Sequence, residues 1–473
     1  MNCRPIFFLF IVFGYCALEG HSLDLENCRQ LALQHNREIQ IAQLEVDKWE
    51  GKKRETRSHF FPTLDFSGSY TRNSLDLAPE LDRKYEDLKL LPEAMSQIFL
   101  GSVTDPGMKA YLGQKIQELI GGLDLPGGLP DRLGEFHASL QLTQPIFTGF
   151  KLTNGFRAVE EARQAALHRY RLVLSDLSFE VTQTYYQCLL ADQLVQVHAE
   201  TVQTGSAHLA IIENMRRQGL ASEWELLKAR VHIQKLTPDW IEAQRNRDLI
   251  YGKMKMLLGR EQNENLELNA NFNVVELPDT VDVDALYSQA LQKREEMLAL
   301  QSVGEAASFM VKKAYGDYLP DIAALASYTY LGLKDDYQIK GDDINTIFTV
   351  GVVARWNLFS FGEHSGKVCQ ARADREKVMH QSAQLKDYIY LQIKNAGNRV
   401  RHARENVALQ KEAGELAEKS LEIAETSYRN GEARQVDVLD AQLDLQAARL
   451  HWNYALFETI LADLELKKVI GDF

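Results

Sequence analysis

Residues 209–219 read LAIIENMRRQG, and residues 421–431 read LEIAETSYRNG. Five positions are identical between the two stretches at a constant offset of 212 residues: Leu209/Leu421, Ile211/Ile423, Glu213/Glu425, Arg217/Arg429 and Gly219/Gly431. The same register extends without a gap from 145–261 to 357–473. Single identities of this kind carry little weight, but their persistence over such a length predicts a duplicated structural unit.

A second pair of segments repeats at a different offset. Residues 24–70 match 282–328 at an offset of 258, so the first copy carries about 46 residues that the second lacks. These extra residues must lie within 71–137, where we expect short helices over 80–99 and 108–120 and a loop over 121–130. We therefore expect a first repeat over 23–263, a linker over 264–280 and a second repeat over 281–473, each with a helix, a strand hairpin and a long helical hairpin.

The longest part of each repeat is expected to be helical. Residues 151–217 and 363–430 contain no proline. At 1.5 Å per residue each segment forms a helix of about 100 Å, which is too long for a globular core to cover. Glycines 219 and 431 then suit helix ends, and second helices are expected over 222–258 and 434–470. Proline 238 is expected to interrupt the first of these returning helices.

Short segments with alternating side chains lie between the helices. The helical openings, 24–58 and 282–316, end just before Pro62 and Pro320. After Pro62, apolar Leu64 and Phe66 alternate with polar neighbours, and similar alternation is found in 322–330, 136–143 and 348–356. Strands of this length with one apolar face are typical of membrane barrels. Strands packed on a soluble core would also alternate, but the length of the helices argues against that alternative.

Four strands per chain cannot close a barrel by themselves. An open sheet edge in lipid would leave unpaired backbone groups without water. The chain must therefore oligomerise, as a dimer with eight strands or a trimer with twelve. The number of helices favours the trimer, because twelve long helices surround a wider lumen.

Composition and the N-terminus limit the class of protein. The 473 residues have a net charge of −13, which disfavours binding to nucleic acid. No apolar run of about 20 residues follows the N-terminus, so a membrane-spanning helix is not expected. Residues 1–22 resemble a signal peptide, and the residues before Cys16 do not match a lipidation site.

The remaining cysteines and histidines do not indicate a catalytic or metal site. Cys28, Cys188 and Cys369 lie far apart without CxxC pairs, and we expect them to be small buried apolar residues. The sequence lacks an HExxH motif, a phosphate-binding loop and a nucleophile elbow. We therefore expect no catalytic residue, no metal site and no cofactor, so the chain is not expected to be an enzyme.

Several segments, in this order, resemble a known family. They are QPIFTG at 144–149, WNLFSFG at 356–362 and YRNG at 428–431, followed by VDVLDA at 436–441. With the duplicated order of hairpins, the chain resembles the TolC-like outer membrane efflux proteins. The resemblance implies an α+β membrane protein of the cell outer membrane. It would be a homotrimer with a twelve-stranded β-barrel that continues into a long periplasmic α-helical coiled-coil barrel.

The same resemblance implies partners and a transport function. The chain would be the exit duct of a tripartite efflux or type I secretion system. It would work with a periplasmic adaptor, also called a membrane fusion protein, and an inner-membrane transporter of the RND, ABC or MFS type. The sequence leaves open whether small molecules or polypeptides pass. The competing hypothesis is a periplasmic or secreted coiled-coil scaffold without a pore.

The resemblance also implies roles for particular residues. Asp437 and Asp440 match the acidic positions of the periplasmic aperture. Glu225, Tyr428 and Arg434 correspond to a latch that holds the aperture shut, although the family's arginine position is occupied by Ala433 and Arg434 is next to it. The adaptor-contacting tips would be Gly219, Leu220, Gly431 and Glu432. The carboxylates have a simpler alternative explanation, because acidic residues also favour the first turn of any helix.

Overall fold

The computed structural model describes residues 23–74, 100, 106–121, 132–269, 276–334 and 339–473. The predicted signal peptide, Cys16, much of the insertion and part of the linker lie outside the described residues. The chain forms two compact units. The helical unit comprises Met1–Arg54, Gly155–Val311 and Lys367–Phe473, and the sheet unit comprises Glu55–Asn154 and Lys312–Gly366.

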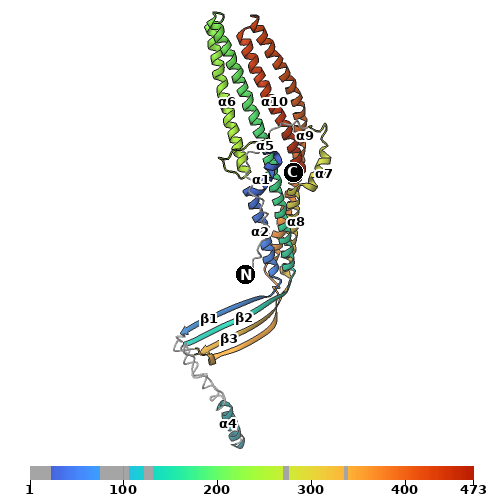
Figure 1. Cartoon of the computed structure of the whole chain (residues 1–473). Coiled ribbons are helices and arrows are strands. Elements are labelled where there is room, and N and C mark those ends of the chain that lie inside the picture. Colours follow the sequence, from blue (N-terminus) through green and yellow to red (C-terminus); the bar gives the residue numbers. More distant parts are fainter. Residues whose placement is uncertain (1–22, 75–99, 101–105, 122–131, 270–275, 335–338) are drawn as a thin grey trace. The chain divides into compact units, whose positions relative to one another are not determined.

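Two long helical hairpins form most of the helical unit. The first consists of α5 (Lys151–Arg217) and α6 (Glu223–Leu257), and the second of α9 (Glu363–Arg429) and α10 (Gln435–Ile470). Helices α5 and α9 have the same length, 67 residues. In each pair the two helices run side by side, and both turns lie at the same end of the helical unit (Figure 1). The predicted helical hairpins are therefore present.

The expected interruption at Pro238 is wrong, because α6 continues through this proline. Neighbouring side chains hold the helix against α5 at Gly205. A Cβ atom at Gly205 would lie 2.9 Å from the Cδ1 of Ile233 and 3.4 Å from the Cδ1 of Leu236. This close packing supports the helix in the turn before the proline, where one backbone hydrogen bond is lost.

The two helical openings are each broken once, contrary to the prediction of uninterrupted helices. The first comprises α1 (Leu25–His35) and α2 (Arg37–Ser58), and the second α7 (Val283–Lys293) and α8 (Glu295–Tyr315). At the first break, Asn36 donates from Nδ2 to the carbonyl of Leu257 over 3.3 Å. At the second, Arg294 pairs with Glu296 over 2.8 Å. Tertiary and local polar contacts therefore end α1 and α7.

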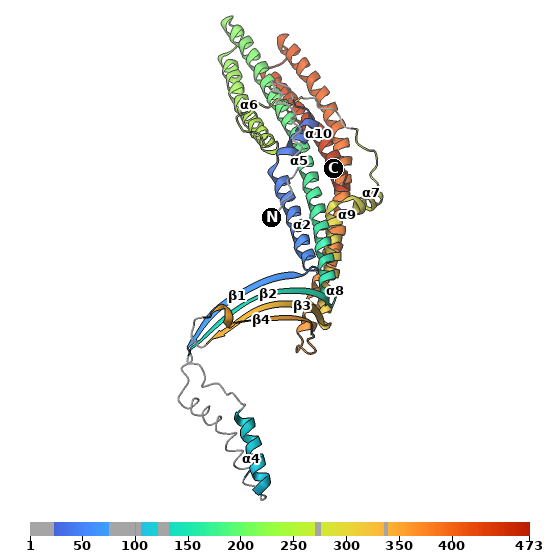
Figure 2. The same ribbon diagram turned by 60° about the horizontal axis from the view of Figure 1, so that its bottom comes forward.

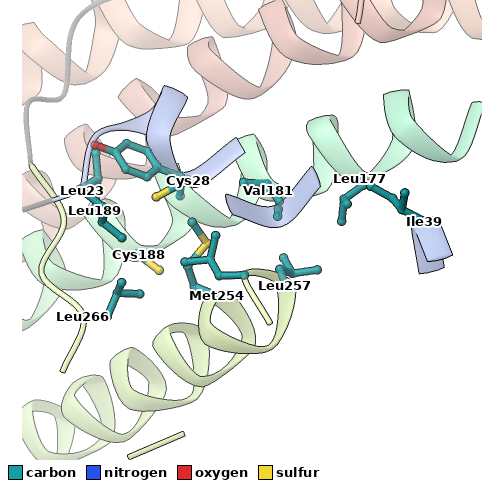
Figure 3. Close-up of a cluster of buried hydrophobic side chains, with 13 residues drawn as sticks. Leu23, Cys28, Ile39, Leu177, Val181, Cys188, Leu189, Met254, Leu257 and Leu266 are labelled. Carbon is teal, nitrogen blue, oxygen red and sulfur yellow. The ribbon is translucent and has the colours of Figure 1, made fainter. Parts of the chain in front are cut away.

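The largest apolar cluster joins the first helices to the first long hairpin (Figure 3). Cys28 of α1 and Cys188 of α5 are fully buried in it, as is Met254 of α6. Burial raises the pKa of both thiols to about 12. The two cysteines are thus small buried residues, as predicted, but that prediction is wrong for Cys369, which is exposed on α9.

The sheet unit contains one antiparallel sheet in the order β1-β2-β3-β4 (Figure 2). The strands are β1 (Thr63–Ser74), β2 (Arg132–Thr148), β3 (Asp321–Lys334) and β4 (Ile344–Arg355). Within this chain β1 and β4 are edge strands. Strands β1 and β2 are longer than expected. The residues between them, the insertion, are therefore 75–131 and not 71–137.

One helix of the insertion is described. Helix α4 (Pro106–Gly121) contains the segment 108–120 that the sequence predicts to be helical. The other predicted helix, 80–99, and the predicted loop after residue 121 lie outside the described residues. Two short 3-10 turns, η1 (Gly316–Tyr318) and η2 (Gly341–Asp343), precede β3 and β4.

The register of the sheet separates an apolar from a polar face. Direct cross-strand partners on one face are Phe66, Leu140, Tyr328 and Phe348, with exposed fractions of 75%, 44%, 42% and 70%. The adjacent row on the other face is Ser67, Ser139, Thr329 and Ile347, in which the hydroxyls of Ser139 and Thr329 are 3.0 Å apart. The apolar face is thus an open surface in the single chain.

Among the helices in the described ranges, none combines the length and apolar character needed to cross a membrane.

Candidate functional site

The turns of the two long hairpins have the same local structure. The backbone N–H of Leu220 donates to the carbonyl of Met215 over 2.8 Å, and the N–H of Glu432 donates to Ser427 over the same distance. These bonds follow Gly219 and Gly431, whose φ angles of 73° and 81° suit glycine. All four predicted tip residues are exposed, and Leu220 presents 69% of its surface to solvent.

Glu225 belongs to the first turn of α6, where it forms a capping box with Ser222. Its Oε2 accepts from the backbone N–H of Ser222 over 2.6 Å and from the Ser222 hydroxyl over 2.9 Å. A contact with the second hairpin uses the backbone instead, because Gln435 Nε2 of α10 donates to the carbonyl of Glu225 over 3.0 Å. The carboxylate therefore stabilises the start of its own helix, and the carbonyl links the two hairpins.

Asp437 and Arg434 form a charge pair at the start of α10. The Arg434 backbone N–H donates to Asp437 Oδ2 over 2.8 Å, and the guanidinium Nη2 lies 3.1 Å from Oδ1. The hydrogen bond from the Arg434 side chain lowers the pKa of Asp437 from its ordinary value. Asp440 follows on the same side of the helix, one turn later, and is exposed. The two predicted aperture residues thus lie together, and Arg434 pairs with one of them.

Tyr428 of α9 contacts the first hairpin. It packs on an apolar cluster in which Ile212, Ala221 and Ala229 are buried. Its ring centre lies 5.8 Å from that of His208 on α5. Burial raises the pKa of the Tyr428 hydroxyl, and the nearby charge of Glu225 adds to this effect. The structure thus brings Tyr428 and Glu225 together across the hairpins, while Arg434 bonds within its own helix.

Sequence reasoning missed three buried polar residues beside these positions. His208, His232 and Gln435 have exposed fractions of 8%, 8% and 4%. One signal was present in the sequence, because His208 and His232 lie at nearly equal distances on either side of the turn at Gly219. Residues placed in this way face each other across an antiparallel hairpin.

The described residues include no group of three or more His, Cys, Asp or Glu side chains arranged to hold a metal ion. Glu225, Arg434 and Asp437 instead stabilise the starts of their own helices. These side chains can therefore set the electrostatic potential at the turns and hold the helix ends together.

Comparison with protein families gives one match over most of the chain. The sequence profile described as "Outer membrane efflux protein" matches residues 28–260 and 286–472. Among curated proteins, the chain is 22% identical over 337 residues to "Outer membrane protein TolC" of Vibrio cholerae, covering 71% of this chain and 76% of that protein. It is 20% identical over 455 residues to "Probable efflux pump outer membrane protein TtgC" of Pseudomonas putida, covering 95% and 83%.

Solved structures with the same fold include two outer-membrane proteins. The CmeC outer membrane channel of Campylobacter jejuni superposes with a TM-score of 0.75 at 17% identity, covering 95% of this chain and 85% of that one. The outer membrane protein VceC of Vibrio cholerae superposes with a TM-score of 0.72 at 16% identity, covering 94% and 96%.

Proposed function

The chain belongs to the outer membrane efflux protein family, and from this premise we propose that it is the exit duct of a tripartite efflux or type I secretion system. A periplasmic adaptor and an inner-membrane transporter of the RND, ABC or MFS type would deliver the substrate and supply the energy. This chain would conduct it passively to the outside and would have no catalytic activity.

Three predictions from the sequence are confirmed. The chain is similar to TolC-like proteins, it has the fold of the trimeric outer-membrane channels, and it is an outer-membrane protein whose helical part lies in the periplasm. The adaptor, the transporter class, the passage of polypeptides and the roles of individual residues are parts of the proposal.

The observation that carries the proposal is the two-faced sheet with open edges. Phe66 and Phe348 lie on the two edge strands, belong to the same apolar row and are 75% and 70% exposed. An apolar face suits lipid, and unpaired edge groups are costly there. Pairing β1 of one chain with β4 of the next would satisfy the edge groups and leave the apolar face free to contact lipid. Three chains would then supply twelve strands.

We place the aperture at the start of α10. In a trimer Asp437 and Asp440 supply six carboxylates around one constriction, and surrounding protein focuses their field. Arg434 offsets part of this charge, because it pairs with Asp437. The aperture should therefore prefer cations and bind multivalent cations that block it. Of the predicted latch residues, Tyr428 and Glu225 would hold this end closed across the hairpins, while Arg434 pairs within its own helix. The tips at Gly219, Leu220, Gly431 and Glu432 would contact the adaptor.

Single-channel recording in a planar bilayer tests the aperture. Asp437→Ala with Asp440→Ala should abolish block by a trivalent cation and weaken cation preference. The matched control is Asp374→Ala with Asp387→Ala, which removes two exposed aspartates from α9. Unchanged block in the first variant would place the constriction elsewhere.

A second double variant separates the latch from the charge filter. Tyr428→Phe with Glu225→Gln should raise conductance and leave cation block in place, because the aperture carboxylates remain. If conductance stays at the wild-type level, these two residues do not hold the tips together. The same recordings distinguish an exit duct from a coiled-coil scaffold, because a scaffold would form no channels.

A further inference from the structure

A group of polar side chains is buried between the two long hairpins near their turns. We call His208 of α5, His232 of α6, and Gln435 and Gln442 of α10 the polar seam. Their exposed fractions are 8%, 8%, 4% and 5%. In each one, a buried polar atom has no hydrogen-bond partner among the described residues: His208 Nε2, His232 Nε2, Gln435 Oε1 and Gln442 Oε1.

Farther from the turns, Gln446 of α10 and His198 of α5 are hydrogen-bonded over 3.0 Å, and beyond that pair the contact becomes apolar. Leu190 of α5 packs there against Phe457 and Leu461 of α10. Separating apolar surfaces in water is unfavourable, whereas a buried polar atom without a partner gains hydrogen bonds when water reaches it. The hairpins are therefore more easily parted at the polar seam than at Leu190.

Charged and titratable groups from two other helices face His208. Glu425 and Tyr428 come from α9, and His232 comes from α6. Burial is the main influence and lowers the pKa of His208, the charge of Glu425 opposes the shift, and His232 adds to it. Burial therefore favours the neutral form of His208 while the seam is packed.

His232 has a comparable environment. Lys235 of its own helix and Asp440 of α10 are its charged neighbours. The Cδ2 atom of His232 also lies 3.7 Å from the position of a Cβ at Gly205 of α5. Burial is again the main influence and lowers the pKa of His232, Lys235 adds to the shift, and Asp440 opposes it. Protonating either ring inside the seam would create a buried charge, which is costly.

We propose that the polar seam is an acid-operated release, in which proton uptake by His208 and His232 parts the hairpin tips and opens the channel. This inference rests on the proposed exit duct. It assigns the response to pH to two buried imidazoles and not to the aspartates of the aperture.

The direction of the pH effect follows from proton linkage. When the tips part, both rings meet water and regain the ordinary histidine pKa of about 6.5. The parted state then binds more protons than the packed state, so its population rises as pH falls below about 6.5. Above that value both states are neutral and the packed seam is favoured. Each histidine can change the ratio of parted to packed by up to about tenfold per pH unit, and the two together by about a hundredfold.

Channel recordings of the full-length protein at about pH 7.5 and about pH 5.5 test the proposal. The ratio of open to closed should rise at least about tenfold at the lower pH. His208→Gln with His232→Gln keeps polar side chains that cannot charge and should remove this rise. The matched control is His402→Gln with His451→Gln, two exposed histidines of α9 and α10, which should retain it. An acid response that survives in the seam variant would overturn the proposal.

Hydrogen exchange of the wild-type protein gives a second test that needs neither a variant nor a conducting channel. After correction for the intrinsic effect of pH, amides in 205–236 and 425–446 should lose protection in acid, and those around Leu190 and Phe457 should keep it. Equal protection at both pH values would overturn the acid release. If the protein forms no channels but the tips lose protection, the exit-duct proposal fails and the release stands.

Discussion

Replacing Gly149 by alanine should destabilise the sheet unit. Gly149 lies between β2 and α5 with a φ of 58°. A Cβ atom there would lie 2.4 Å from the carbonyl oxygen of Gly316 and 2.9 Å from the Cβ of Leu319. Both separations are shorter than carbon and oxygen atoms tolerate. Either the backbone before β3 or the end of β2 must therefore move.

Two costs contribute to the expected loss of stability. The left-handed backbone costs alanine about 1–2 kcal/mol relative to glycine. Overpacking against a backbone carbonyl costs about 1–3 kcal/mol more, because that oxygen cannot rotate away like a side chain. The free energy of unfolding should thus fall by about 2–5 kcal/mol. Nearby, Lys151 pairs with Asp321 over 2.8 Å and is expected to shift as well.

Two other glycines separate these contributions. Gly219 has a φ of 73° but no atom within 4 Å of a Cβ, so Gly219→Ala should show only the backbone cost. Gly351 has neither feature, and Gly351→Ala should be nearly neutral. The measurement is the temperature at which the folded protein loses its heat-modifiable migration on a gel. For Gly149→Ala it should fall by about 4 °C or more. A midpoint equal to that of Gly351→Ala would refute the reasoning.

Three further outcomes are expected. The mass of the detergent-extracted protein, corrected for bound detergent, should correspond to three chains, because four strands cannot close a barrel, and a stable monomer or dimer would contradict the edge pairing. Trypsin added to intact cells should cleave α4 (Pro106–Gly121), because α4 lies in the connection between β1 and β2, at the end of that hairpin opposite α2 and α5. Cleavage only in broken cells would show that this end of the hairpin faces the periplasm. A maleimide at about pH 7.5 should label Cys369 and spare Cys28 and Cys188 until the protein unfolds, because burial raises the pKa of these two thiols to about 12. Rapid labelling of either buried thiol in the folded protein would contradict their burial.

The secondary structure was largely predictable from periodicity. The alternation of Leu64 and Phe66 with polar neighbours requires a two-faced strand, and the proline-free stretches favour long helices. The sheet register then places Phe66 in one row with Leu140, Tyr328 and Phe348. Such signals are local, because each depends on residues that lie close together in the chain.

The breaks in the helices could not be predicted in the same way. Asn36 ends α1 through a hydrogen bond to the carbonyl of Leu257, which is more than 200 positions away in the sequence. Pro238 leaves α6 intact because Ile233 and Leu236 pack against Gly205 of a different helix. In both cases a contact between distant segments outweighs the local preference.

In the candidate site, too, some features follow from local sequence and others from tertiary contacts. The sequence by itself determined the duplicated order of hairpins, the turns at Gly219 and Gly431, and the two aspartates at the start of α10, because each is set by spacing along one segment. Only the tertiary structure decided the partners of these residues: Glu225 caps its own helix, Gln435 bonds to the Glu225 carbonyl, and the imidazole of His208 lies buried beside Tyr428. Such contacts join separate helices and depend on how their surfaces pack. The spacing of residues within one segment therefore does not determine which side chains become buried.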